Sequence, residues 1–151
     1  MKKMILGILV AVVVICLGYP VTGESTPKPA RGEARHVIGR TAAIISNAQQ
    51  VATQRQKYEG LGLAVSHQLL AIDLYSRNLN RQAINHSIRA RVLAAKVMGG
   101  LVMEALFDRI EENYFQNMPS GKELDQKLQE SQVQILNDQA ALNTQIPLDV
   151  R

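Results

Sequence analysis

This 151-residue chain has one cysteine, no tryptophan and few aromatic residues of any kind. The lone cysteine, Cys16, excludes an intramolecular disulfide and a zinc site built from several thiolates. An aromatic content of 4% leaves few side chains that can stack on bases, so we do not expect a nucleic-acid-binding protein. No proline lies between Arg35 and Pro119, which permits long helices in that range. Packing, rather than cross-links, must therefore stabilise the fold.

Motifs of common catalytic and phosphate-binding chemistry are also missing. The Ser66-His67 pair is not set in a G-x-S-x-G nucleophile elbow, and no glycine-rich stretch is followed by lysine at the spacing of a phosphate-binding loop. Glu111 and Glu112, adjacent in sequence, point about 100° apart on a helix and are interpreted as a solvated acidic edge. We therefore expect a protein that is not an enzyme and that needs no cofactor.

The first 23 residues have the pattern of a secretory signal peptide. Two lysines precede the apolar run of residues 4–18, and the exit sequence Val-Thr-Gly occupies residues 21–23. We favour cleavage after Gly23, because fifteen apolar residues fall short of the roughly 20 that span a membrane. The sequence thus predicts an exported protein, periplasmic or secreted.

Two alternatives for this segment remain open. An uncleaved membrane anchor formed by residues 4–21 would be the protein's only contact with a membrane. Lipidation at Cys16 is the weaker alternative, because lipoprotein signals carry a small residue before the cysteine and this chain has Val14-Ile15 there. Cleavage after Gly23 would remove Cys16 and leave a mature protein without a thiol.

The rest of the chain is expected to form one helical domain with short flanks. Residues 24–34 contain proline, glycine, serine and threonine and are predicted to be a flexible leader. Residues 35–146 are rich in Ala, Leu, Gln, Arg and Glu and show no strand pattern. We predict an all-α fold for them, a small antiparallel bundle of about four to five helices. Residues 147–151 are predicted to be a tail, and the end of the last helix near Pro147 is predicted to fray.

The spacing of apolar residues predicts helices over residues 36–59, 63–77, 81–98, 101–117 and 122–144. Breaks are expected at Gly60 and Gly99, although kinked continuations that join the segments into three long helices are the alternative. The helix over 81–98 has the clearest pattern, with small residues beside an apolar line. Its opposite side is predicted to be solvated, at Asn85, Arg89 and Lys96.

The segment 68–98, which reads QLLAIDLYSRNLNRQAINHSIRARVLAAKVM, resembles a single helical hairpin of the tetratricopeptide repeat type. Asn78 lies near the turn of such a hairpin. The resemblance implies two closely packed antiparallel helices and binding of a protein or peptide, and it carries over no catalytic residue. The matching small or apolar positions are Ala71, Leu74, Ala83 and Ala90.

Charge is distributed unevenly along the chain. Residues 24–98 carry a net charge of +7 and residues 99–151 a net charge of −5, while loss of Lys2 and Lys3 lowers the total from +4 to +2. The two halves can attract each other within one fold, which is the interpretation we favour, or present a basic face to an anionic partner such as a phosphate-bearing envelope polymer.

A basic group along the predicted hairpin is the candidate surface for such a partner. Guanidinium groups bind carboxylate or phosphate through two parallel hydrogen bonds. We favour the alternative that this group forms ion pairs with acidic residues of the next helix, namely Glu104, Asp108, Glu111 and Glu112. The group consists of Arg77, Arg81, Arg89, Arg91 and Lys96.

Histidines supply the remaining candidate chemistry. His67 and His86 are weak candidates for a metal site, because they can approach each other across the hairpin, with Asp73 as a third ligand. Structural histidines are commoner, so we expect no metal.

Together, these features predict an exported, non-enzymatic helical protein that binds another protein or an anionic envelope component. A small periplasmic chaperone or stress sensor is the alternative, although the chain lacks the Leu-Thr-x-x-Gln motif of that class. A metal carrier that uses His67 and His86 is a lesser alternative.

Overall fold

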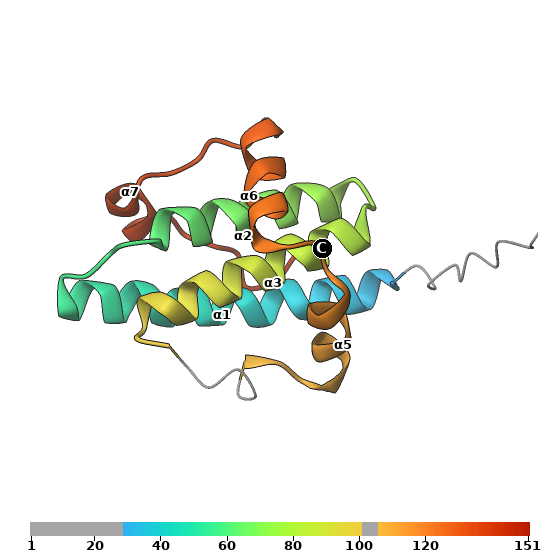
Figure 1. Ribbon diagram of the computed structural model, residues 1–151, viewed down its shortest axis with the longest axis horizontal. Helices are drawn as coiled ribbons and strands as arrows, with labels where there is room; N and C mark the ends of the chain where they lie inside the picture. The colour runs from blue at the N-terminus through green and yellow to red at the C-terminus, as the bar shows by residue number, and fades with distance from the viewer. Residues whose placement is uncertain (1–28, 101–105) are drawn as a thin grey trace, which may run out of the picture.

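The computed structural model describes residues 29–100 and 106–151, which form six helices and no strand (Figure 1). The predicted all-α class is confirmed. The predicted signal segment, residues 1–23, lies outside the described residues. None of the described helices combines the length and the hydropathy that crossing a membrane requires. The helices are α1 (Arg31–Arg55), α2 (Leu61–Ser76), α3 (Asn80–Val97), α5 (Arg109–Asn117), α6 (Gly121–Glu130) and α7 (Asp138–Leu142).

The three long helices α1, α2 and α3 pack against one another and form the core (Figure 1). Buried alanines on all three, such as Ala42, Ala71 and Ala90, let the helix backbones approach closely. Between them lie two clusters of buried aliphatic side chains. One cluster includes Ile38, Leu70, Leu74, Ile84 and Ile88, and the other includes Ile45, Leu61, Val65, Leu93 and Val97.

The predicted helix breaks are confirmed. Gly60 (φ 90°) precedes α2, and Gly99 (φ 101°) with Gly100 (φ 79°) follows α3. These positive φ values favour glycine because it lacks a Cβ. The predicted turn of the α2–α3 hairpin is also present, with Asn78 in the left-handed conformation at φ 59°.

Several predicted helix boundaries are wrong. Helix α1 begins at Arg31, inside the predicted leader 24–34, and ends at Arg55 because Gln56 adopts a left-handed conformation at φ 52°. The helix predicted over 101–117 has residues 101–105 outside the described part, and α5 begins only at Arg109. Asp108 precedes it because the Asp108 carboxylate caps the helix, accepting hydrogen bonds from two backbone amides at 3.0 Å.

The single helix predicted over 122–144 is wrong. Helix α6 ends at Glu130, residues 131–137 form an irregular segment, and the short α7 follows. The Ser131 hydroxyl accepts a hydrogen bond from the Val133 amide at 3.2 Å, which stabilises a turn in place of the next helical turn. The buried Ser66 hydroxyl of α2 accepts one from the Leu136 amide at 2.8 Å. The helix thus ends where backbone amides form hydrogen bonds with side chains instead, one of them on α2.

Residues 147–151, predicted to be a tail, lie against α1. Val150 is buried, and Asp149 accepts two hydrogen bonds of 2.8 Å from the Arg35 guanidinium. One apolar side chain and one ion pair therefore hold this C-terminal segment to the core.

Gly62, in the first turn of α2, lies against the backbone that leads into α7. Its amide donates a hydrogen bond to the Asp138 carboxylate at 2.7 Å, and a Cβ there would lie 2.8 Å from the Asn137 carbonyl carbon. We expect Gly62→Ala to lower the free energy of unfolding by about 1–3 kcal/mol, measured by urea denaturation, because backbone must move to admit the methyl group. The matched control is Gly32→Ala in α1, where nothing lies within 4 Å and a loss is not expected. Equal losses at both positions would contradict the packing argument.

Candidate functional site

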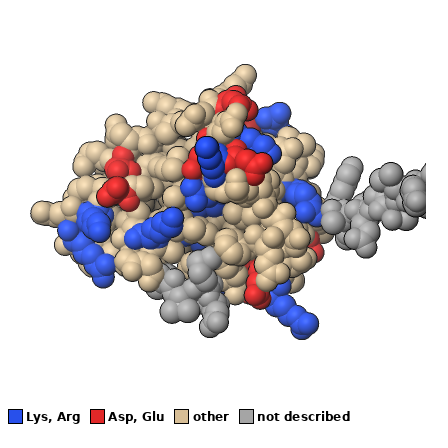
Figure 2. All heavy atoms as spheres, viewed as in Figure 1, with Lys and Arg blue, Asp and Glu red and all other residues tan. Residues whose placement is uncertain are grey.

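The structure separates the five basic residues that the sequence places on one binding surface. Arg77 is exposed and pairs with Asp73 of its own helix at 3.3 Å. Arg81 and Lys96 lie in the first and last turns of α3. On the face drawn in Figure 2, basic and acidic side chains are interspersed, with no continuous basic patch.

Arg89 and Arg91 are each paired with a carboxylate. Arg89 donates two hydrogen bonds, of 2.9 and 2.7 Å, to Asp125 of α6. Arg91 is fully buried and donates two, of 2.7 and 2.8 Å, to Glu111 of α5. The prediction of a partner-binding surface is therefore wrong for Arg91, which no partner can reach. The favoured alternative, ion pairing with the following acidic residues, is confirmed for Arg91 with Glu111.

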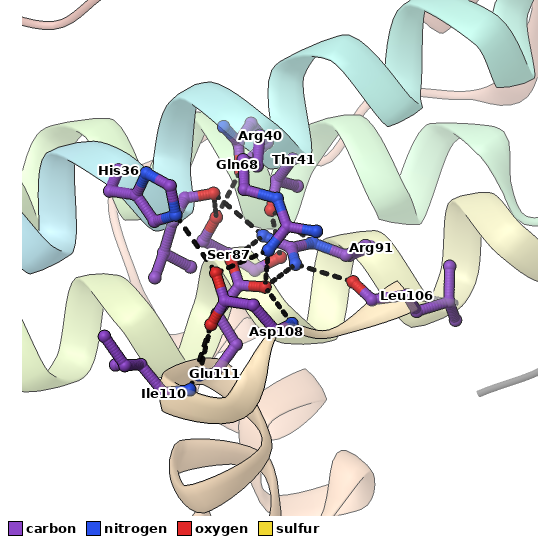
Figure 3. Close-up of polar contacts among 11 residues, drawn as sticks. His36, Arg40, Thr41, Gln68, Ser87, Arg91, Leu106, Asp108, Ile110 and Glu111 are labelled. Atoms are coloured by element: carbon purple, nitrogen blue, oxygen red, sulfur yellow. Dashed lines mark hydrogen bonds and ion pairs between the residues drawn. The ribbon is translucent and has the colours of Figure 1, made fainter. Parts of the chain in front are cut away.

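The buried Arg91 guanidinium uses all five of its N–H groups (Figure 3). Besides Glu111, it donates to the Thr41 hydroxyl and to the backbone carbonyls of Val37 and Leu106, at 2.8 to 3.0 Å. A buried charge is tolerated when it is both paired and fully hydrogen-bonded. This cluster joins α1, α3 and α5, and its role is structural.

Glu111 was predicted to lie on a solvated acidic edge, and that prediction is wrong. Its side chain is fully buried, whereas Glu112 is exposed as predicted. The Glu111 carboxylate also accepts hydrogen bonds from the Asp108 amide and from Arg40 (Figure 3). Glu104, the other predicted partner, lies outside the described residues.

His36, Asp108 and Glu111 place one ligand atom each within 4.8 Å of one another, a spacing that suits a metal ion. The Arg40 guanidinium occupies the same place, 2.7 Å from Asp108 and in contact with Glu111. Burial raises the pKa of Asp108, but hydrogen bonds from the Glu111 amide and His36, together with the charge of Arg40, lower it overall. Two guanidinium groups already neutralise the two carboxylates, so we assign no metal to this cluster.

A second polar cluster contains the predicted metal candidates His67 and His86. Their Nδ1 atoms lie 2.9 Å apart, and the stacked rings have centroids 5.2 Å apart. The predicted approach across the hairpin is confirmed. The predicted third ligand, Asp73, pairs with Arg77, and Asp125 of α6 contacts His67 Nε2 at 2.9 Å instead. No local pattern points to Asp125, because it lies 58 residues from His67 in sequence.

The geometry of this cluster is that of a hydrogen-bonded chain rather than a metal centre. A zinc ion bound by both Nδ1 atoms at 2.0–2.1 Å would hold them about 3.4 Å apart in a tetrahedral site. Burial lowers the pKa of His67, and burial together with the charges of His67 and Lys127 lowers the pKa of His86 to about 4. Both rings are therefore neutral at pH 7, and a single shared proton fits the 2.9 Å separation.

A groove of about 770 Å³ opens between α6 and the α2–α3 hairpin, with His86 among its lining residues. Its aliphatic lining comes from α2, the hairpin turn and the segment after α6. Its charged lining has both signs. The aliphatic residues are Leu70, Leu74, Leu79 and Val133, and the charged ones are Asp73, Arg77, Lys127 and Glu130.

Neither protein-family models, nor curated proteins, nor solved structures show a match to this chain. The similarity of residues 68–98 to a tetratricopeptide-type hairpin stays a prediction, although α2 and α3 do form an antiparallel pair. The groove and the two polar clusters are therefore the features that bear on function.

Proposed function

We propose that this protein is an exported, non-enzymatic helical domain that binds a segment of another protein in the groove between α6 and the α2–α3 hairpin. The observation that carries the proposal is the groove itself, with aliphatic side chains and charges of both signs around one opening. Export rests on the pattern of residues 1–23 alone.

The lining of the groove supports a peptide as the occupant. Its volume of about 770 Å³ lies within the usual range of binding clefts and suits a few side chains rather than a large polymer. Arg77, Lys127, Asp73 and Glu130 all line the groove, so neither sign dominates. A segment with aliphatic side chains flanked by neutral or mixed charges matches this surface.

A polyanionic envelope component is less well supported. Strong anion binding needs unpaired cations that converge on one ligand. Arg89 and Arg91 are already neutralised by Asp125 and Glu111, and Arg77 pairs with Asp73. The remaining two cations of the predicted group lie at opposite ends of α3.

A general chaperone is also less well supported. Binding of many unfolded chains calls for a broad apolar surface. The large apolar side chains exposed in residues 29–100 and 106–151 lie on separate elements, and only one of them lines the groove. They are Leu79, Ile110, Ile135 and Leu148.

Site-specific photo-cross-linking in the producing cell tests the proposal. Benzoylphenylalanine in place of Leu79, which lines the groove and is 36% exposed, is expected to form one discrete protein adduct. The same residue in place of Leu148, which is 64% exposed and lies outside the groove, is the matched control and is expected to form none. Val133→Glu, which adds a charge to the lining, is expected to abolish the Leu79 adduct.

Mapping of the cross-linked peptide completes the test. We expect the partner's peptide to carry aliphatic side chains. Adducts of equal yield from both positions, an adduct that survives Val133→Glu, or a cross-link to lipid or polysaccharide would contradict the proposal. Suppression of the aggregation of an unrelated denatured protein, unaffected by Val133→Glu, would instead favour the chaperone.

A further inference from the structure

We propose that a small hollow in the groove wall, built around His86 and Asn85, recognises a hydroxyl group on the bound segment, with His86 Nε2 accepting a hydrogen bond from that hydroxyl. This inference rests on the proposed function and names the chemistry of one contact within it. The hollow has a volume of about 100 Å³. It is lined by Gln82, Asn85, His86, Leu124 and Lys127.

Three side chains form a row of contacts, Asp125 to His67 and His67 to His86, and Asp125 determines where the protons lie. Asp125 is held as a carboxylate by the Arg89 guanidinium, and hydrogen bonds from Arg89 and His67 lower the pKa of Asp125 despite its partial burial. An ionised carboxylate only accepts hydrogen bonds. The contact of 2.9 Å between His67 Nε2 and Asp125 therefore requires that His67 Nε2 carries its ring's proton.

This constraint extends to His86. A neutral imidazole has one N–H, so His67 Nδ1 is unprotonated and can only accept. At 2.9 Å from it, His86 Nδ1 must donate and must carry the proton of the second ring. His86 Nε2 is consequently left unprotonated. The carboxylate on α6 thus fixes the tautomers of both histidines.

His86 Nε2 and the Asn85 amide are available. Neither has a hydrogen-bond partner among the described residues, and both residues line the hollow. Asn85 is only 8% exposed, so a ligand in the hollow can supply hydrogen bonds that the described residues do not give its amide. The sequence had placed Asn85 on the solvated side of its helix.

The hydrogen-bonding character of the hollow selects the class of ligand. An unprotonated His86 Nε2 repels phosphate and carboxylate oxygens, because it is itself an acceptor, and it needs a donor. The Lys127 ammonium and the Asn85 amide line the same hollow and supply donors. A hydroxyl group donates once and accepts as well, so it satisfies both kinds of partner. Among peptide side chains, serine, threonine and tyrosine carry such a hydroxyl, and the hollow of about 100 Å³ favours the two small ones, serine and threonine.

The tautomers are tested by ¹⁵N nuclear magnetic resonance of the imidazoles in the free protein at pH 7. We expect His67 to be protonated at Nε2 and His86 at Nδ1, with His86 Nε2 showing the shift of an unprotonated nitrogen. Protonation of His86 at Nε2 would overturn the proposal. This measurement needs no partner, so its outcome is independent of the cross-linking result from Leu79.

The hydroxyl preference is tested with two small probes of nearly equal shape. Isopropanol, which donates and accepts, is expected to shift the His86 Nε2 and Asn85 amide signals several-fold more than acetone at the same concentration, because acetone only accepts. Asp125→Asn removes the fixed acceptor for His67 and is expected to reduce that difference at least two-fold. Asp149→Asn, in the distant contact with Arg35, is the matched control. Equal shifts from the two probes in the unmodified protein would overturn the proposal.

Discussion

Glu111→Ala is expected to lower the free energy of unfolding by about 3–5 kcal/mol, because it leaves the Arg91 guanidinium buried without its counter-charge. Both side chains are fully buried, and α5 carries the only carboxylate that the structure pairs with Arg91 among the described residues. Urea denaturation at pH 7, with the midpoint and slope both recorded, measures the loss. The change in slope also reports whether α5 detaches before the rest of the fold unfolds.

A matched exposed pair separates burial from charge. Arg77→Ala breaks the exposed ion pair with Asp73 and is expected to cost under about 0.5 kcal/mol. The double substitution Arg91→Met with Glu111→Leu removes both charges from the cluster and is expected to recover much of the loss seen in Glu111→Ala. A loss below about 1 kcal/mol for Glu111→Ala would show that Arg91 finds solvent or another partner, contrary to the structure.

Acidification from pH 6.5 to pH 4 is expected to remove about 3 kcal/mol of stability through His86 alone, since its pKa falls from 6.5 in the unfolded chain to about 4 in the folded protein. The unfolded chain binds the proton first, so the contribution is complete above pH 6.5, declines as the pH falls, and is lost below pH 4. The groups that face His86 are His67, Asp125 and Lys127. Protonation adds the second proton at His86 Nε2 and would place a cation beside Lys127.

The comparison that isolates this effect is His86→Gln. The free energy of unfolding of both proteins is measured by urea denaturation at half-unit steps from pH 7.5 to pH 4. The difference between the two proteins is expected to shrink steadily below pH 6.5. The pKa of His67 is lowered as well, which adds a slope of the same sign in both proteins. Parallel curves for the two proteins would contradict the assigned burial of His86.

The two polar clusters have different consequences for the groove. The Arg91–Glu111 cluster fixes α5 and lies away from the groove, so its substitutions are expected to act through stability. The His67–His86–Asp125 chain fixes α6, which forms one wall of the groove, and it also sets the hydrogen-bonding character of the hollow beside it. A substitution of Asp125 is therefore expected to change both the stability of the fold and the recognition of a ligand in the hollow.

The sequence by itself determined the helical class, the breaks at Gly60 and Gly99, and the turn at Asn78. Each of these follows from local rules: apolar periodicity favours a helix, and the left-handed conformation favours glycine or asparagine. The approach of His67 to His86 was also predictable, because both lie on one hairpin with a short turn. These features depend on residues that are near each other in the chain.

Only the tertiary structure decided which helix surfaces are covered. Asn85 and Glu111 were predicted on solvated helix sides and Arg91 in a partner-binding basic group, but all three are buried where α5 and α6 pack against α3. The partners of Arg91 come from three separate elements, and Asp125 lies 58 residues from His67. A charged residue can be buried once a distant carboxylate neutralises it, and local periodicity carries no information about that partner.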